Sequence, residues 1–277
     1  MSTSVRKYYD QNTSLFLAFS SSKKAQNIHR SLWTDGARTL EEALNVSNAR
    51  ILQEITSVAP EHARLLDLGC GVGASLFYIV PRLRDPSYTI GFTISSLQAK
   101  LARESAKQLG LQDQVLFAQG DFTSLPLNDT WDAAYSIEAI FHATDPETYF
   151  FEVSRLLRPG GKLILVDDFQ TQRPFSNIET DWLKAYRDGW HVQGLNTVEQ
   201  VNLWAEKHRL QLVKNDNLTP YLRLRDLPDP LARAIRFFGN HLPIRHAILP
   251  SMLGSLALQQ CLRMRIVKYR FLVFEKI

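Results

Sequence analysis

The sequence contains little cysteine and no long apolar run. Only two of its 277 residues are cysteines, Cys70 and Cys261, and they lie far apart, which excludes a framework of disulfide bonds. No apolar stretch approaches the ~20 residues that a membrane-spanning helix needs. The N-terminus shows no basic segment followed by an apolar core, as a secretion signal would. These absences predict a soluble protein of the cytoplasm.

Metal-binding spacings are also missing, because the chain has no H-E-x-x-H sequence and no cluster of Cys and His residues. A bound metal is therefore not predicted. The charge is uneven: residues 219–277 carry ten Lys and Arg against three Asp and Glu, a balance of +7, so the remaining chain carries −3 of the net +4. Such a basic segment can face an anionic membrane, a phosphorylated substrate or nucleic acid, or it can simply form a solvated helix surface.

Two patterns follow one another along the chain. Up to Pro60, apolar residues recur at helical spacing, which predicts a helical arm over residues 1–60. Beyond it, short apolar segments alternate with helical patterns, as in a parallel sheet built from βαβ units. The predicted strands are residues 64–68, 88–92, 114–118, 131–136, 162–167, 212–217 and 269–274. The predicted helices between them are residues 75–83, 96–109, 145–157 and 197–208.

Seven strands predict an α/β domain with one long insertion before the last strand. The core of this domain comprises residues 61–218 and 265–277, and residues 219–264 form a helical insertion suited to a lid over a substrate. Residues 170–196 show a polar, aromatic-rich pattern that we interpret as a connection. With 45% hydrophobic residues, the chain can bury one sizeable core with such a lid.

The most informative segment is LLDLGCGVG at residues 65–73, in which an apolar strand runs into a glycine-rich turn. Glycine lets the backbone approach a ligand closely, and the start of the following helix offers unpaired N–H groups. The segment therefore predicts a nucleotide-like cofactor at the carboxyl edge of the sheet. Gly69, Gly71 and Ala74 also satisfy the dinucleotide pattern, so an NAD(P)-binding protein or a non-catalytic scaffold remains an alternative.

Two features disfavour NAD(P). Asp67 lies directly before the glycine loop, where its carboxylate would repel a pyrophosphate but can accept hydrogen bonds from a cationic amino-acid moiety. The second strand ends in the sequence GFTIS at residues 91–95, which lacks the acid that would hold the ribose of a dinucleotide.

These segments resemble a known family. Residues 67–73 are similar to motif I of class I S-adenosylmethionine-dependent methyltransferases. Residues 91–98 resemble the G-x-T-x-S-x-x-Q variant of the sterol, tocopherol, cyclopropane-fatty-acid and prenyl-diphosphate methyltransferase group, and residues 120–122 and 157–161 match two further motifs. The resemblance implies a Rossmann-like seven-stranded sheet of order 3-2-1-4-5-7-6 with the last strand antiparallel.

The resemblance also implies S-adenosyl-L-methionine as the cofactor and S-adenosyl-L-homocysteine as its product. The cofactor-binding residues that it implies are Asp67, Gly69, Cys70, Gly71, Gly73, Thr93, Ile94, Ser95, Gln98, Asp121, Phe122 and Ile137.

A candidate catalytic pair follows the fourth strand, in the segment SIEAIFH at residues 136–142. Glu138 and His142 are four residues apart and so share one face of a helical turn beside the cofactor. In the family that the chain resembles, this E-x-x-x-H position carries the catalytic or charge-stabilising carboxylate. Glu138 would suit C-methylation through a carbocation, whereas His142 would suit a base for N- or O-methylation. A helix-capping Glu and a surface His are the structural alternative.

The acceptor side is predicted from aromatic residues. Residues 8–10 and 28–33 resemble the family's F-Y-D element and its H-x-x-x-W segment, and aromatic rings suit a pocket around a sulfonium cation. The expected pocket residues are Tyr8, His29, Trp33, Phe141, Phe169 and Trp182. Their composition favours a small apolar acceptor, such as an isoprenoid, a sterol-like or quinone-like molecule or another natural product. C-methylation of that acceptor is what the resemblance and Glu138 imply.

Nucleic acid is not expected as a substrate, because no N/D-P-P-Y-type motif follows the fourth strand. Arginines of residues 219–264 could instead grip a diphosphate, which would bring Mg²⁺, or hold the protein at a membrane that contains its substrate. The sequence leaves the oligomeric state open.

Overall fold

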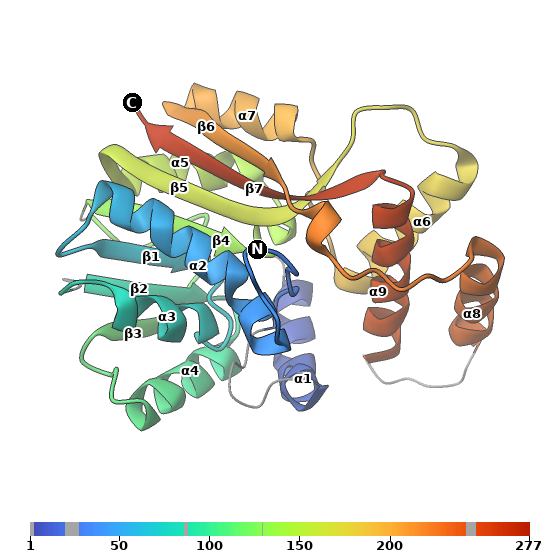
Figure 1. The fold of residues 1–277 in the computed structure, drawn as a ribbon, viewed down its shortest axis with the longest axis horizontal. Helices are drawn as coiled ribbons and strands as arrows, with labels where there is room; N and C mark the ends of the chain where they lie inside the picture. The colour runs from blue at the N-terminus through green and yellow to red at the C-terminus, as the bar shows by residue number, and fades with distance from the viewer. Residues whose placement is uncertain (1–2, 20–27, 86–87, 129, 242–247) are drawn as a thin grey trace.

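The computed structural model describes residues 3–19, 28–85, 88–128, 130–241 and 248–277 (Figure 1). Its central layer is one seven-stranded sheet of order β3-β2-β1-β4-β5-β7-β6, as predicted. β7 runs antiparallel to both of its neighbours, and the other pairs are parallel. The strands are β1 (Arg64–Leu68), β2 (Tyr88–Thr93), β3 (Val115–Gln119), β4 (Trp131–Ile137), β5 (Leu157–Gln170), β6 (Leu210–Asn217) and β7 (Val267–Lys276).

Helices surround this sheet, and the described part of the chain contains no helix that is long and apolar enough to cross a membrane. Parts of the predicted arm and lid, namely residues 1–2, 20–27 and 242–247, lie outside the described residues. The helices are α1 (Thr3–Phe19), α2 (Leu40–Val58), α3 (Ala74–Ile79), α4 (Ser96–Gln108), α5 (Pro146–Leu156), α6 (Asn177–Trp190), α7 (Val198–Lys207), α8 (Asp229–His241) and α9 (Ile248–Arg263), with short turns η1 (Val80–Arg82), η2 (Ile140–His142) and η3 (Thr219–Tyr221).

Both faces of the central strand β1 are buried, because successive side chains of a strand point to opposite sides of the sheet. Leu65 belongs to the apolar cluster that includes residues of α2, α3 and α4, such as Ile51. Leu66 belongs to the opposite cluster, with residues of α5 and α7, such as Tyr149. Figure 1 shows α2 and α3 in front of the sheet. A strand buried on both faces reads as a continuous apolar run, and Asp67 is the one polar residue that interrupts it.

A third apolar cluster joins α6, α8 and α9 beyond the end of the sheet, on the right of Figure 1. Trp182 and Tyr186 of α6 are its largest fully buried side chains. α6 and α9 approach closely at Gly189, where a Cβ atom would lie 2.5 Å from the Cα of Gly254 and 2.6 Å from the carbonyl oxygen of Pro250. Only glycine fits at this crossing, since the atoms that a side chain would meet belong to the backbone.

α6 corrects the prediction of residues 170–196 as a connection. The side chain of Ser176 accepts the backbone N–H of Glu179, and the Glu179 carboxylate accepts the backbone N–H of Ser176, which forms a capping box. This Ser-x-x-Glu signature is visible in the sequence. The aromatic residues that follow it led to the prediction of a connection. In the structure they form the face of α6 that packs on α9, which lies about seventy residues further along the chain.

β5 also differs from the prediction, since it begins at Leu157 and not at residue 162. Gly160 has a φ of +72°, and the pairing with β4 shifts register between Trp131 and Ala133. Residues 157–161, which match a motif of the family, therefore form an irregular first stretch of the strand.

Gly189→Ala should lower the free energy of unfolding by about 1–3 kcal/mol, because the added methyl group overpacks the contact between α6 and α9. Urea unfolding followed by circular dichroism measures the change. Met252→Ala is the control: Met252 is 61% exposed on α9, and its truncation should change stability by less than about 0.5 kcal/mol. A Gly189→Ala protein as stable as the parent would show that the helices do not meet here.

Candidate active site

A cavity of about 490 Å³ opens at the carboxyl ends of β1, β2 and β4. The glycine loop, the start of α3, the end of β2 and the turn after β4 line it on one side. The N-terminal segment, the start of α2, Trp190 of α6 and Ser255 of α9 also line it. Its lining includes Tyr9, Ile28, His29, Arg30, Ser31, Asp67, Gly69, Cys70, Gly71, Thr93, Ile94, Gln98, Phe122, Ile137, Glu138, His142, Trp190 and Ser255.

The glycine loop keeps the cavity open. Gly69 has a φ of +103°, and a Cβ atom on it would lie 2.5 Å from the Cβ of Ala139. Gly71 has a φ of +55°, and a Cβ atom there would meet no atom within 4 Å. The loop thus needs glycine for its backbone conformation at both positions, and beside Gly71 it leaves room for a ligand.

Asp67 is the polar residue at the end of β1, and its side chain is almost fully buried beside the cavity. Burial raises the pKa of Asp67 to about 7, although the hydroxyl of Tyr135 donates a hydrogen bond of 2.9 Å to its carboxylate. Because burial disfavours the ionised form of this carboxylate, a cationic partner would stabilise it. The site therefore fits a ligand that carries an amino group at this point.

The polar side chains after β2 fasten helix α1 over the cavity. Thr93 donates to the side chain of Gln98 at 2.7 Å, and Gln98 donates to the hydroxyl of Thr13 at 3.2 Å. Ser95 donates to the carboxylate of Asp10 at 2.5 Å and also caps α4. Thr93 and Gln98 line the cavity, whereas Ser95 lies outside its lining, against α1.

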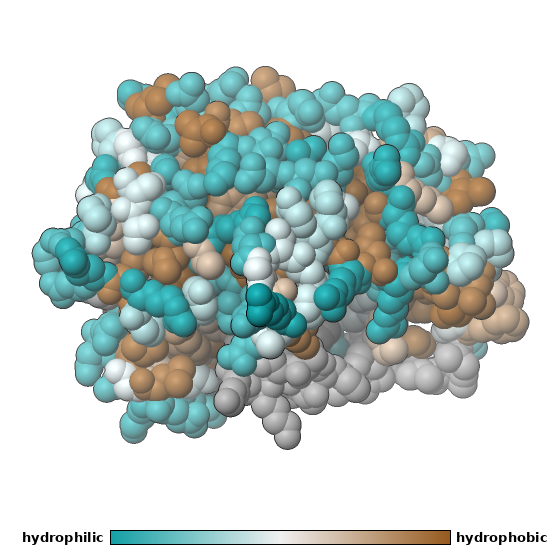
Figure 2. Space-filling view, in the orientation of Figure 1, coloured by the Kyte–Doolittle hydropathy of each residue, from teal (hydrophilic) through white to brown (hydrophobic). Residues whose placement is uncertain are grey.

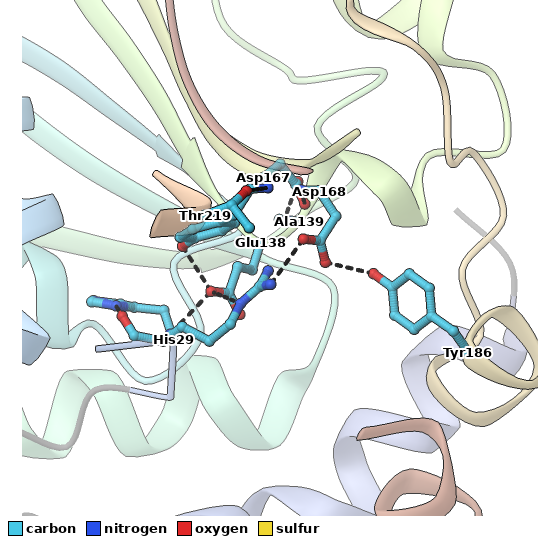
Figure 3. A network of polar contacts seen from close by, with 9 residues as sticks. His29, Glu138, Ala139, Asp167, Asp168, Tyr186 and Thr219 are labelled. Carbon is cyan, nitrogen blue, oxygen red and sulfur yellow. Dashed lines mark hydrogen bonds and ion pairs between the residues drawn. The ribbon is translucent and has the colours of Figure 1, made fainter. Parts of the chain in front are cut away.

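Glu138 reaches the cavity from a strained turn, since its φ is +50°. Its Oε1 atom accepts three hydrogen bonds: from the backbone N–H of Arg30 at 3.0 Å, from the Arg30 Nε–H at 3.0 Å and from the Tyr269 hydroxyl at 2.8 Å (Figure 3). Burial favours the protonated acid, but the Arg30 charge and these donors outweigh it and lower the pKa of Glu138. The side chain is therefore a carboxylate at neutral pH.

Arg30 joins Glu138 to a second carboxylate. Its Nη1 atom donates to Asp168 at 2.8 Å, and the other oxygen of Asp168 accepts the hydroxyl of Tyr186 from α6 at 2.7 Å (Figure 3). The guanidinium also stacks on the ring of Tyr269, 3.9 Å from its centroid. This chain of contacts connects the N-terminal segment, β5, β7 and α6 at one point of the cavity wall.

His142 forms a second polar pair with Tyr9. Its Nδ1 atom lies 3.3 Å from the carbonyl oxygen of His191, which can only accept, so Nδ1 carries the proton. Nε2 therefore accepts the hydrogen bond from the Tyr9 hydroxyl, at 2.7 Å. Burial lowers the pKa of His142 to about 4, so the ring is neutral at pH 7.

Comparison with known proteins gives a consistent result. Residues 66–165 match the model of a methyltransferase domain. A methyltransferase of Streptomyces halstedii named GfsG is 32% identical over 226 residues, which cover 80% of this chain and 78% of that protein. The 24-methylenesterol C-methyltransferase 2 of Oryza sativa subsp. japonica is 37% identical over 184 residues, covering 65% and 50%. The cyclopropane synthase MmaA2 of Mycobacterium tuberculosis shares the fold, with a TM-score of 0.77, 20% identity and 98% of each chain covered.

The chain belongs to the S-adenosylmethionine-dependent methyltransferases. S-adenosyl-L-methionine, the cofactor of this family, carries its reactive methyl group on a positively charged sulfur. The cavity of this methyltransferase fits such a molecule, because it combines an open glycine loop with two carboxylates, Asp67 and Glu138, and apolar surface from Phe122.

Nine of the predicted cofactor residues line the cavity of the methyltransferase, as do His29, Glu138 and His142. Three predicted cofactor residues do not: Gly73 caps α3, Ser95 caps α4, and the Asp121 carboxylate accepts hydrogen bonds from Thr123. These nine lining residues are Asp67, Gly69, Cys70, Gly71, Thr93, Ile94, Gln98, Phe122 and Ile137.

The predicted acceptor residues are scattered. Phe141 lines a smaller neighbouring cavity of about 200 Å³. Tyr8 contacts Ser251 through its hydroxyl, the Arg223 guanidinium stacks on the ring of Trp33, Phe169 packs in the sheet core, and Trp182 donates its indole N–H to Asp229. These last four side chains lie outside the lining of both cavities.

Sequence reasoning missed the partners of Glu138. Arg30 lies inside the segment that resembles H-x-x-x-W, but its role there has no sequence signal, since its two carboxylate partners are 108 and 138 residues away. Tyr186 lies in the predicted aromatic-rich connection and Tyr269 at the start of the last predicted strand, and neither position points to Glu138.

Asp67→Asn should weaken the binding of S-adenosyl-L-methionine by about 10- to 100-fold, because a charge-assisted contact to the amino group is lost. Calorimetric titration measures the affinity, with NAD(P)H titrated in parallel and expected not to bind. Asp35→Asn, which alters an exposed ion pair with Arg50, is the control and should bind normally. Unchanged affinity in the Asp67 variant would mean that the cofactor lies elsewhere.

Binding should also depend on pH through Asp67. Below its pKa of about 7 the free site holds a neutral acid, and a cationic ligand requires the carboxylate. Affinity should therefore fall as pH drops from 7.5 to 5.5, and binding near pH 6.5 should release a proton. Titrations in two buffers of different ionisation enthalpy count that proton. If Asp67→Asn releases the same proton on binding, that proton comes from another group.

Proposed function

We propose that the protein transfers the methyl group of S-adenosyl-L-methionine to a carbon atom of a small apolar acceptor. The observation that carries the proposal is the state of Glu138, a buried carboxylate that lines the cofactor cavity and stays ionised beside Arg30. Methylation of a carbon–carbon double bond leaves a cation on the acceptor. A fixed negative charge beside that cation lowers the energy of the transition state.

The proton chemistry also favours carbon as the acceptor atom. A carbocation loses its neighbouring proton readily, so even a weakly basic carboxylate can accept it. A hydroxyl or ammonium group holds its proton far more tightly and needs a stronger base. The lowered pKa of Glu138 makes it a weak base, which suits the first case and not the second.

The acceptor is proposed to occupy the smaller cavity of about 200 Å³, which shares Arg30 and Glu138 with the cofactor cavity. Most of its other walls are apolar, which favours an isoprenoid, sterol-like or quinone-like molecule. The name of the rice relative, a sterol C-methyltransferase, is consistent with this class. The described residues of the insertion, 219–241 and 248–264, together with α6 would then form the lid over the acceptor. The apolar walls include Phe141, Leu222, Leu224, Leu258 and Leu262.

N- or O-methylation is the second candidate, and the pair of Tyr9 and His142 is the observation that favours it. Tyr9 lines the cavity and donates to the Nε2 atom of the neutral His142. The acceptor's proton would pass to the Tyr9 oxygen while the Tyr9 proton moves to Nε2. Burial that lowers the pKa of His142 to about 4 makes this ring a weak base, which ranks this function second.

Glu138→Gln should lower turnover by about 100-fold or more, the scale of a positioned acid–base group, and should leave the affinity for S-adenosyl-L-homocysteine unchanged. Candidate acceptors of the isoprenoid, sterol-like and quinone-like classes would be screened by mass shift, and NMR of the product locates the new methyl group. Tyr9→Phe is the discriminating variant, expected to retain most of the activity. Full activity in Glu138→Gln together with loss of activity in Tyr9→Phe would rank N- or O-methylation above C-methylation.

The α8 surface is proposed to contact an anionic membrane that holds the acceptor. Leu231, Ile235, Phe237 and Phe238 of α8 are each at least 43% exposed, and Figure 2 shows hydrophobic surface at the right-hand edge, where α8 lies in Figure 1. Exposed aromatic and aliphatic side chains on an amphipathic helix suit the interface of a bilayer. α8 carries two Arg and one Asp, a balance of +1, within residues 219–277, whose balance is +7.

Replacing Phe237 and Phe238 by serine should reduce co-sedimentation with vesicles rich in phosphatidylglycerol at least several-fold. Leu203→Ser is the matched control, because Leu203 is 65% exposed on the distant helix α7. Equal loss in both variants, or no loss in either, would argue against a membrane role for α8.

A further inference from the structure

Arg30 occupies a position that neither cofactor binding nor methyl transfer by itself requires. It comes from the N-terminal segment, its side chain is only 21% exposed, and it bridges two carboxylates on different elements, Glu138 after β4 and Asp168 on β5. Burying a guanidinium is costly unless its donors are paired with good geometry. The distances of 3.0 Å to Glu138 and 2.8 Å to Asp168 meet that condition on both sides.

The contacts also orient Glu138. The backbone N–H and the Nε–H of Arg30 and the hydroxyl of Tyr269 all meet the same atom, Oε1. Within the described part of the chain, Oε2 is thus the oxygen left to face a ligand in the cavity. A carboxylate with one oxygen held by three donors has little freedom to rotate, so its charge stays at a fixed place.

We infer that Arg30 is a positioning residue, which keeps Glu138 negatively charged and holds one of its oxygens toward the cavity, and that Asp168 with Tyr186 holds Arg30 in place. The inference deepens the proposed function, since it names the residue that equips Glu138 to face a cationic acceptor. It concerns the charge and orientation of Glu138 in the free enzyme, and so it can be tested without an acceptor.

The charges around Glu138 show why Arg30 is needed. Two of the groups that face Glu138 are the acids Asp167 and Asp168, whose pKa values are raised by burial and also by the Glu138 charge, and burial lowers the pKa of His29. Arg30 supplies the permanent positive charge in this set. Without its side chain, Glu138 would keep the Tyr269 hydroxyl and the backbone N–H of residue 30 as donors in a buried site. The titratable and charged groups that face Glu138 are Tyr9, His29, Arg30, Asp167, Asp168 and Tyr269.

Tyr186 links the groups around Glu138 to the third apolar cluster, which joins α6, α8 and α9. Its hydroxyl holds the second oxygen of Asp168, so a residue of α6 helps to fix the guanidinium that fixes Glu138 (Figure 3). Both Tyr186 and Asp168 line the smaller cavity that we assign to the acceptor. The positioning set therefore borders the proposed acceptor site and not only the cofactor site.

The test is a direct titration of Glu138 by ¹³C NMR, in the full-length protein labelled at its glutamate side-chain carboxyl carbons. Glu138→Gln identifies the resonance by its disappearance. In the parent protein this resonance should stay at the position of an ionised carboxylate from pH 5.5 to 8. In Arg30→Met it should titrate within that range, because loss of an adjacent cation shifts a carboxyl upward by about 1–3 pH units.

Arg50→Met is the matched control: Arg50 pairs with Asp35 at the surface, and its loss should leave the Glu138 resonance unchanged. If Arg30→Met does not fold, Arg30→Met combined with Asp168→Asn removes one positive and one negative charge, and Glu138 still lacks its cation. The Glu138 resonance should again titrate at higher pH than in the parent, with a smaller shift because the Asp168 charge is also lost. A Glu138 resonance that stays ionised in the variant that folds would overturn the inference.

Activity adds a second readout once an acceptor is known. In Arg30→Met the acidic limb of kcat/KM should move to higher pH and kcat should fall, while the affinity for S-adenosyl-L-homocysteine stays within about threefold. Arg30→Lys keeps the positive charge and should move that limb less than Arg30→Met does. A purely structural role would lower activity at all pH values without moving that limb, and would count against the inference. If Glu138 titrates as expected but Glu138→Gln retains full turnover, the proposed function fails and the role of Arg30 stands.

Discussion

The Asp167 side chain, near the C-terminal end of β5, holds the turn that follows β4. It accepts hydrogen bonds from the backbone N–H groups of Ala139 and Ile140, each at 3.0 Å, and from that of Asp168 at 2.8 Å. Glu138 lies in this turn with a left-handed backbone, which a residue with a side chain adopts only where its surroundings impose it. Without the Asp167 contacts the turn could relax, and Glu138 would no longer be aimed at the cavity or at Arg30.

The cavity is built for a positively charged guest at two separate points. Asp67 at the end of β1 is buried without a cationic partner among the described residues that line the cavity near it, so an amino group would relieve the cost of its burial. Glu138 at the end of β4 already has a cation, Arg30, and keeps its charge whether or not a ligand is bound. The first carboxylate would therefore gain from a bound amino group, and in the proposed reaction the second would stabilise a cation on the acceptor.

The N-terminal helix closes the site from the side of β2. Ser95 is bonded to Asp10 and Gln98 to Thr13, so polar side chains of the cofactor motif also hold α1 in place. Tyr9, on the same helix, points into the cavity. A helix fastened in this way limits the access of water, which strengthens every electrostatic contact inside. Gln98 thus both lines the cavity and holds α1 in place.

The sequence by itself determined the sheet, the glycine loop and the places of Asp67 and Glu138. These are local signals: a strand buried on both faces reads as an apolar run, a left-handed turn requires glycine, and a polar residue at a strand's carboxyl end stands out against that run. Only the tertiary structure decided the partners of Glu138 and the course of α6. Arg30, Asp168, Tyr186 and Tyr269 meet because four separate elements cross at one point, and contacts between distant segments leave no periodic or spacing signal in the chain.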